Sequence, residues 1–163
     1  MGINWRQFEL GILRPALEGE PEVAIKLVGE TIFHESDRLR ALGQYPNPAD
    51  DMGQRAVEVF GPGLGIASIE EATWDWMVGK ADSGRWNHTI FEELSSRMYQ
   101  ELAWDLKLNV LACRFRYKVD KRPLPENNMV SRSIYWMAVY NGSGVEDRRL
   151  GYVRNAVDIE WVK

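Results

Sequence analysis

The sequence predicts one α+β domain that is predominantly helical and carries a single small β-hairpin. The chain has 163 residues and is 45% hydrophobic, so it is long enough to bury one core. Neither an internal repeat nor a low-complexity linker divides it. Apolar residues recur at helical spacing through most of the chain, and one glycine turn lies between short β-like runs. We therefore expect residues 1–163 to fold as one unit.

Two helices are predicted before the hairpin. Asn4 can cap the first, and Pro21 suits the start of a second helix that leads to Glu35. One face of this second helix is apolar at helical spacing: Ala24, Leu27, Val28, Thr31 and Ile32. Glu35 is the next position on that buried face. Glu30 and His34 fall on the opposite, polar face and are expected at the surface.

The hairpin is predicted from a glycine turn and the runs beside it. Arg55–Phe60 and Gly65–Ile69 have the composition of short strands around Gly61-Pro62-Gly63. The next segment, Glu70–Val78, has the pattern of a helix. We therefore expect a hairpin followed directly by a helix.

Three further helices are predicted in the second half of the chain. A long central helix is expected from residue 90 to about Tyr117, because one apolar stripe continues along it: Met98, Leu102, Leu106, Val110, Cys113 and Tyr117. A second helix is expected over Val130–Tyr140 and should stop at Asn141-Gly142, a C-terminal glycine signal. The last is expected over Asp147–Val162, with one apolar face: Leu150, Val153, Val157 and Trp161.

Composition argues against several classes of partner. The net charge is -4, with a pI near 5.3, so electrostatics give no reason to expect nucleic acid. The single cysteine, Cys113, excludes an internal disulfide framework, and neither His34 nor His88 has a second ligand at zinc spacing. No run approaches the ~18 apolar residues of a transmembrane helix, and the N-terminus lacks the pattern of a signal peptide. We expect a soluble protein without a metal.

Glu35 is the strongest candidate for chemistry. A carboxylate on the core-facing side of a helix end is partly desolvated, and desolvation disfavours its charged form. A carboxyl that stays protonated near neutral pH can donate a proton to a glycosidic oxygen. The sequence therefore favours a general acid at this position.

Three segments carry a resemblance to a known family. They are Glu35-Ser36 at a helix end, Gly63-Leu64-Gly65-Ile66-Ala67-Ser68-Ile69-Glu70-Glu71-Ala72-Thr73, and Ala138-Val139-Tyr140-Asn141-Gly142. In this order they resemble the lytic transglycosylase and goose-type lysozyme superfamily, whose pattern is Glu-Ser, Gly-Leu-Met-Gln-Ile-x-Pro-Ala-Thr and Ala-Tyr-Asn-Ala-Gly. Within it, the chain is most similar to small members carried by bacteriophages. The resemblance implies a lysozyme-like domain.

The resemblance also implies a reaction and a set of site residues. Glu35 would be the sole catalytic acid and base in cleavage of the bond between N-acetylmuramic acid and N-acetylglucosamine in peptidoglycan glycan strands, with no cofactor and no metal. Tyr140 would lie close to its carboxyl. The substrate-binding residues would be Ser36, Gly63, Leu64, Gly65, Ser68, Tyr140 and Asn141.

Several alternatives stay open. Asp50, Asp51 and Glu58 are candidates for the second carboxylate of a hydrolase, although each is better explained as a solvated charge. Trp74, Trp76 and Trp86 could stack on sugar rings, fill the core or bind a protein. A phage protein of this kind would reside in the virion tail, or in the host cytoplasm before release, and would act in the host periplasm.

A second function class competes with the enzyme. Ser68 stands where the family has glutamine, and it is too short to reach a substrate amide in the same way. The chain also contains seven tryptophans, which could form a subunit interface. The alternative is a catalytically inactive structural or assembly protein of a phage tail that retains the lysozyme-like fold and contacts other virion proteins.

Overall fold

A computed structural model of the chain describes residues 3–39, 63–81, 93–142 and 144–162. The elements in chain order are α1 (Trp5–Phe8), η1 (Glu9–Leu13), α2 (Arg14–Ala16), α3 (Glu22–Glu35), β1 (Gly63–Leu64), β2 (Ile69–Glu70), α5 (Glu71–Ala81), η3 (Tyr99–Ala103), α7 (Leu106–Lys118), α8 (Met129–Trp136), η4 (Met137–Asn141) and α9 (Glu146–Ala156). η1 and η4 are π-helical, and η3 is a 3₁₀ helix. Over these ranges the fold is α+β and predominantly helical, as predicted.

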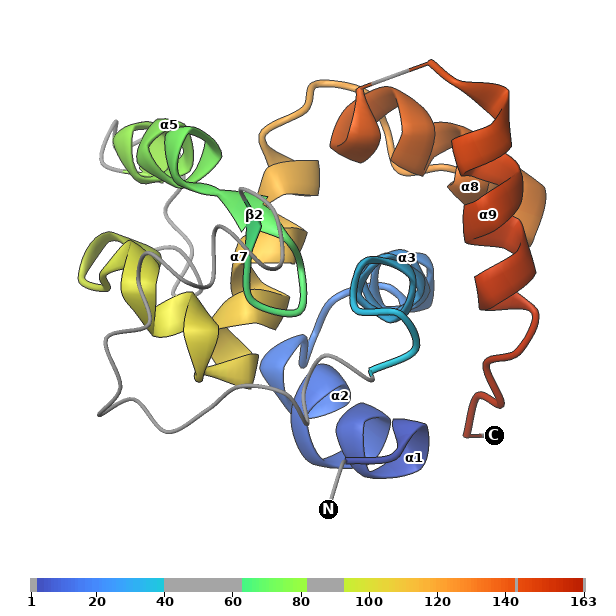
Figure 1. Cartoon of the computed structure of the whole chain (residues 1–163), viewed down its shortest axis with the longest axis horizontal. Helices are drawn as coiled ribbons and strands as arrows, with labels where there is room; N and C mark the ends of the chain where they lie inside the picture. The colour runs from blue at the N-terminus through green and yellow to red at the C-terminus, as the bar shows by residue number, and fades with distance from the viewer. Residues whose placement is uncertain (1–2, 40–62, 82–92, 143, 163) are drawn as a thin grey trace.

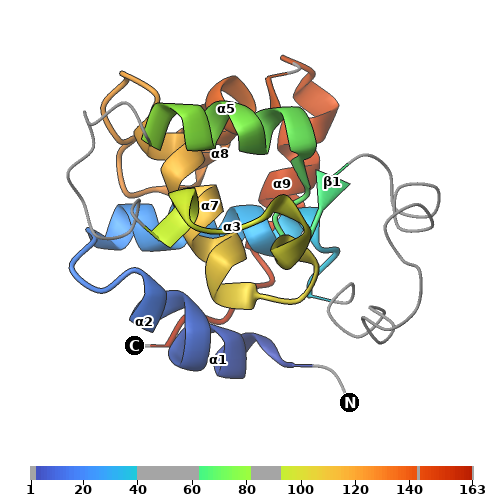
Figure 2. The same ribbon diagram turned by 90° about the vertical axis from the view of Figure 1, so that its left-hand side faces the viewer.

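Helix α3 lies at the centre of the molecule, with α7, α8, α9 and η1 packed around it (Figure 1, Figure 2). All five residues of its predicted apolar stripe are fully buried. Gly29 lets two other segments approach the helix closely, because a Cβ there would lie 2.7 Å from the Trp161 ring and 2.8 Å from a Leu13 methyl. The helix ends at Glu35, as predicted.

The prediction that Glu30 and His34 lie at the surface is wrong. Glu30 is fully buried and accepts hydrogen bonds from Arg132 of α8, at 2.6 Å from Nη2 and 2.8 Å from Nε. The Tyr152 hydroxyl of α9 donates to the same carboxylate at 3.1 Å. His34 is half-buried, and its Nδ1 lies 2.9 Å from the Asn155 side-chain amide. This face of α3 is polar because α8 and α9 supply matching polar groups.

Polar contacts also fix the N-terminal helices. Asn4 caps α1 as predicted, and its side chain accepts from Gln7 N at 2.9 Å. Glu9 is fully buried, where it accepts from Arg14 Nε at 2.8 Å and from Val162 N at 3.0 Å. The last described residues therefore contact the first helices.

The hairpin is present, but it lies at different residues. Strands β1 and β2 pair antiparallel, with Gly63 opposite Glu70 and Leu64 opposite Ile69. The segment 65–69, predicted as a strand, is mostly the turn between them. Gly65 and Ser68 both have positive φ, and Ser68 N donates to Gly65 O at 3.1 Å, which an extended strand does not allow. The other predicted strand, 55–60, lies outside the described residues.

The predicted helix after the hairpin is confirmed by α5, but the long central helix is wrong. Between residues 93 and 118 the chain forms η3 and then begins a new helix, α7. Met98, expected in the buried stripe, is 63% exposed, whereas Val110, Cys113 and Tyr117 are buried. Within the stripe Leu102 of η3 is also buried, but the continuous helical face holds only along α7.

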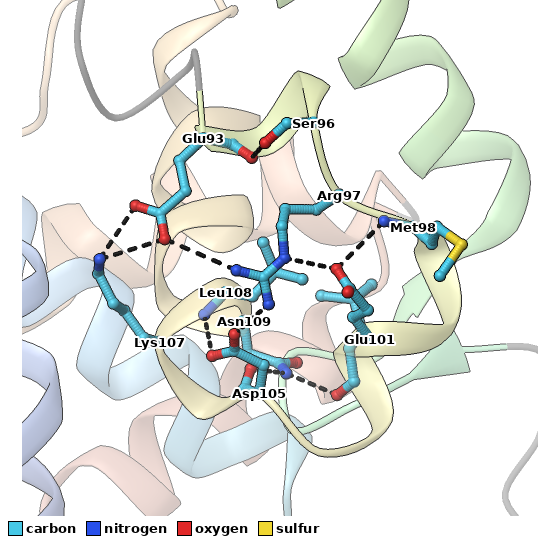
Figure 3. Close-up of polar contacts among 10 residues, drawn as sticks. Glu93, Ser96, Arg97, Met98, Glu101, Asp105, Lys107, Leu108 and Asn109 are labelled. Carbon is cyan, nitrogen blue, oxygen red and sulfur yellow. Dashed lines mark hydrogen bonds and ion pairs between the residues drawn. The ribbon is translucent and has the colours of Figure 1, made fainter.

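A cluster of charged residues explains the break (Figure 3). Asp105 caps α7, because its side chain accepts from Leu108 N at 2.9 Å. Arg97 contacts the carboxylates of both Glu101 and Asp105. An aspartate whose side chain satisfies a first-turn N–H favours a helix start over a helix interior.

The C-terminal helices follow the prediction in part. α8 and η4 together cover the expected helix and end at Gly142, which has φ +66° and donates its N–H to Met137 O at 2.9 Å. α9 ends earlier than predicted, at Ala156. Its predicted apolar face is wrong, since Leu150 is 44% and Val157 is 59% exposed, while Tyr152 is fully buried.

We expect Arg132→Met to destabilise the fold strongly, because it leaves the fully buried Glu30 carboxylate without its cation. Removing one partner of a buried pair costs about 3–5 kcal/mol, to be measured by urea unfolding. The control is Arg122→Met, which breaks a more exposed pair with Asp120 and should cost less than about 1 kcal/mol. Equal losses in the two variants would contradict this account of α3.

Candidate active site

The Glu35 carboxyl lies at the last residue of α3 and is partly buried. Burial raises its pKa from 4.5 to about 7. Weaker influences act in the opposite direction: the Trp136 indole and the guanidinium charges of Arg116 and Arg148 favour the carboxylate. No described residue forms an ion pair with Glu35, so desolvation dominates. Burial therefore moves the pKa of Glu35 towards neutral pH.

Trp136 supplies a second unusual group. Its indole Nε1 is buried and has no hydrogen-bond acceptor among the described residues, although it interacts with the Glu35 carboxyl closely enough to lower its pKa. The ring packs edge-on against His34 and is stacked on Tyr152. A buried N–H without an acceptor within hydrogen-bond geometry is costly in a fold, and here the nearby carboxyl is the group that it influences.

Tyr140 lies in the same neighbourhood. Its hydroxyl is buried and donates to the Ala67 carbonyl. The pKa of Tyr140 is raised well above its usual value, first by burial and then by the nearby Cys113 and Glu35 groups. The structure therefore brings Glu35 and Tyr140 together, but the tyrosine hydroxyl is bonded to the hairpin turn.

The hairpin turn is held by helix α7. Asn109 accepts from Ala67 N at 3.3 Å and donates to Leu102 O at 2.7 Å. Gly65 is buried directly against this side chain, since a Cβ at Gly65 would lie 2.0 Å from Asn109 Oδ1. Its φ of +74° is also one that other residues adopt at a cost. Gly65 thus allows the turn to approach α7.

Ser36 has its hydroxyl engaged within the protein. Ser36 Oγ donates to Ile32 O at 2.6 Å and accepts from Leu39 N at 3.0 Å. The three residues from Asp37 to Leu39 all have positive φ, so the chain turns sharply after α3. In this structure Ser36 shapes that turn, at the residue following Glu35.

Arg116 contacts Tyr140 and also lines a pocket. Its Nη2 donates to the Tyr140 carbonyl, and its guanidinium carbon lies 4.6 Å from the centre of the Tyr140 ring. The pocket has a volume of about 410 Å³ and is lined by residues of α5, of the end of α7 and of η4: Ala72, Thr73, Trp76, Arg116, Val119, Asp120 and Val139. Arg116 therefore lines this pocket and also acts on Glu35.

The other predicted site residues have varied positions. Gly63 and Leu64 form β1, and Ser68 ends the turn, all three partly exposed. Asn141 is the last residue of η4 and is also partly exposed. Trp74 is buried in the core, whereas Trp76 is 48% exposed and lines the pocket. The remaining candidates, Asp50, Asp51, Glu58 and Trp86, lie outside the described residues.

Sequence reasoning missed Asn109, Arg116 and Trp136. Spacing carried a signal for each: Asn109 and Arg116 lie four residues before and three after Cys113, on the same face of α7, and Trp136 lies four residues before Tyr140. Cations are common at helix C-termini, so the position of Arg116 near the end of α7 does not by itself indicate a site.

Comparisons with models of known families, with curated proteins and with solved structures found no match. Among the described residues, no cluster of three or more His, Cys, Asp or Glu could hold a metal ion. Likewise, no described helix is long and apolar enough to cross a membrane. The argument for function therefore starts from Glu35 and its surroundings.

We expect Gly65→Ala to destabilise the protein by about 2–4 kcal/mol, because a methyl group would overlap Asn109 and the backbone would be strained. The matched control is Gly79→Ala in α5, where a Cβ meets nothing within 4 Å. This substitution should stabilise the protein by up to about 1 kcal/mol. Denaturant unfolding measures both. A neutral Gly65→Ala would mean that the turn does not need its contact with α7.

We expect Glu35→Gln to change how stability depends on pH. The folded-state pKa of Glu35 is raised, so wild-type stability is fully present below pH 4.5 and is lost as pH rises to about 7. The difference between these pKa values corresponds to about 3 kcal/mol. The variant should therefore gain stability relative to wild type by up to this amount between pH 4 and 8, measured by urea unfolding. If the difference in unfolding free energy between variant and wild type does not change with pH, the carboxyl is well solvated.

Proposed function

We propose that the protein is a peptidoglycan-degrading enzyme of the lytic transglycosylase or lysozyme type, with a lysozyme-like fold. Its substrate would be the glycan strand, cleaved between N-acetylmuramic acid and N-acetylglucosamine. The observation that carries the proposal is the pKa of about 7 at Glu35, on a partly buried carboxyl that interacts with Tyr140 and Arg116. The three sequence segments that resemble the family also contribute these residues.

The chemistry requires one group to donate and later accept a proton. Protonated Glu35 would give its proton to the glycosidic oxygen, which leaves with N-acetylglucosamine as the bond to C1 of the muramic acid breaks. The Glu35 carboxylate would then take the proton of the C6 hydroxyl as its oxygen bonds to C1 and closes the 1,6-anhydro ring. In a lysozyme-type reaction water would replace that hydroxyl. A pKa near 7 suits both steps.

The surrounding groups would tune and position this acid. Arg116 and the Trp136 N–H favour the carboxylate, so they would stabilise the state that follows proton donation. Tyr140, held by its bond to Ala67, would bring the hairpin turn close to the carboxyl. The partly exposed residues of this hairpin, Gly63, Leu64 and Ser68, would then face the sugar.

A phage origin is part of this proposal. The protein would be carried in the virion tail or released from the host cytoplasm at lysis, and would act in the host periplasm. Peptidoglycan glycan strands, and in the first case other virion proteins, would be its partners.

The second candidate is a catalytically inactive tail or assembly protein with the same fold. It is favoured by the exposure of two large aromatic side chains, Trp76 at 48% and Trp104 at 56%, since exposed tryptophans are typical of interfaces. Ser68 in place of the family glutamine points the same way. Loss of activity would leave the fold and the interface intact.

We expect Glu35→Gln to abolish clearing of purified peptidoglycan in a zymogram, with a rate loss of at least about 100-fold, because general acid catalysis is removed. The control is Glu18→Gln, at an exposed glutamate in the turn after α2, which should clear like wild type. Mass spectrometry of the products separates anhydro ends from reducing ends, and so transglycosylase from hydrolase. If neither wild type nor variants clear the wall, the structural protein is favoured.

A further inference from the structure

The pocket that Arg116 lines is chemically asymmetric. Its α5 side offers an exposed indole ring, Trp76, and the Thr73 hydroxyl. Its opposite side is formed by the C-terminal end of α7 and by Val139 of η4. A flat aromatic ring and a few polar groups around a hollow of about 410 Å³ fit a sugar-sized ligand.

The positive charge of Arg116 is not matched by a carboxylate. Among the residues that the structure describes, its guanidinium has one hydrogen-bond acceptor, the neutral Tyr140 carbonyl, and no ion-pair partner. Its Nε is buried without an acceptor. Five N–H donors are present in an arginine side chain, so most of this guanidinium's capacity is unused.

The acidic residue in the pocket is already paired. Asp120 accepts from Arg122 Nε and Nη2, both at 2.8 Å, and from Arg122 N at 2.9 Å. The same contacts hold the pKa of Asp120 below its usual value. Because Arg122 compensates Asp120, Arg116 leaves the pocket with an excess of positive charge.

We propose that this pocket is a subsite for an anionic sugar, in which Arg116 binds a carboxylate substituent of the glycan and Trp76 stacks on the ring. The inference rests on the proposed function, which makes the ligand a glycan strand, and it adds that the bound sugar carries a negative charge. Guanidinium and carboxylate match in geometry, and such charge-assisted bonds are the strong ones. In peptidoglycan this carboxylate would be the lactyl group of a muramic acid whose stem peptide has been removed, because the stem peptide otherwise occupies that group as an amide.

Binding at this subsite would also act on the catalytic carboxyl. The charge of Arg116 lowers the pKa of Glu35. A bound carboxylate offsets that charge, so the pKa of Glu35 would rise on binding and its protonated form would be favoured when substrate is in place. An anionic substrate would thus help to prepare its own proton donor.

The test is a binding measurement on the full chain carrying Glu35→Gln, which prevents turnover. The probes are a tetrasaccharide of two N-acetylglucosamine–N-acetylmuramic acid repeats with free lactyl carboxylates, and the same compound with those groups converted to amides. Calorimetry should show at least about tenfold tighter binding of the acid form, the ratio expected for one charged hydrogen bond. Raising the salt concentration should reduce this ratio.

Variants in the same background assign the effect to residues. Adding Arg116→Gln should bring the ratio to about one, whereas Arg154→Gln, at an exposed arginine of α9, should leave it unchanged. Trp76→Ala should weaken both probes equally, and Trp104→Ala, at another exposed tryptophan, neither. Circular dichroism checks that each variant is folded. The affinity ratio of the two probes and its salt dependence are also measured in the protein that carries Glu35→Gln alone, so this part of the test does not depend on the folding of the Arg116→Gln variant.

Each outcome decides one question. Three outcomes would overturn the subsite. The affinity ratio of the acid and amide probes could be near one while Arg116 is intact, neither probe could bind, or the ratio could persist in the Arg116→Gln variant. Wild-type cleavage combined with any of these would leave the proposed function standing without it. A ratio that depends on Arg116 in a protein that does not cleave peptidoglycan would support the subsite and reject the enzyme.

Discussion

The burial of helix α3 at the centre of the fold is the constraint from which the rest follows. A helix with neighbours on several faces cannot leave its polar side chains in water, so each must find a partner or change its ionisation. Glu30 has a cation at 2.6 Å, Arg132. Glu35, five residues later, has none among the described residues, and its pKa rises to about 7. One helix therefore yields a structural carboxylate and a candidate acid.

Helix α7 connects the parts of the candidate site. Asn109, Cys113 and Arg116 lie on one face of it, at i, i+4 and i+7. Asn109 holds the hairpin turn and Arg116 holds the end of η4 through the Tyr140 carbonyl. Tyr140 closes the arrangement by bonding to Ala67. Segments more than 70 residues apart in sequence are thus positioned by one helix face.

The features that the sequence predicted are those set by local rules. The Asn4 cap, the buried stripe of α3 and the stop at Gly142 depend on neighbours within a few residues. The features that it missed depend on distant partners. Glu30 is buried because Arg132, 102 residues away, pairs with it, and no local pattern contains that information. Asp105 lies between these two cases. Its local sequence is that of a good helix cap, but the apolar stripe on both sides of it favours a continuous helix.

The placement of Arg116 would meet two opposing demands that the proposed catalytic role makes on Glu35. A cation within ion-pair distance would stabilise the carboxylate and lower its pKa, as such contacts do elsewhere in this chain for Glu20 and Glu22, and the proton donor would be lost at neutral pH. Without any nearby cation the pKa of Glu35 would rise further, and the carboxyl would release its proton less readily. Arg116 is held by the Tyr140 carbonyl and ring, so its charge acts on Glu35 without a direct bond. Desolvation, offset by Trp136 and then by Arg116, leaves the carboxyl close to the midpoint of its titration at neutral pH, which is the condition that the proposed acid and base would need.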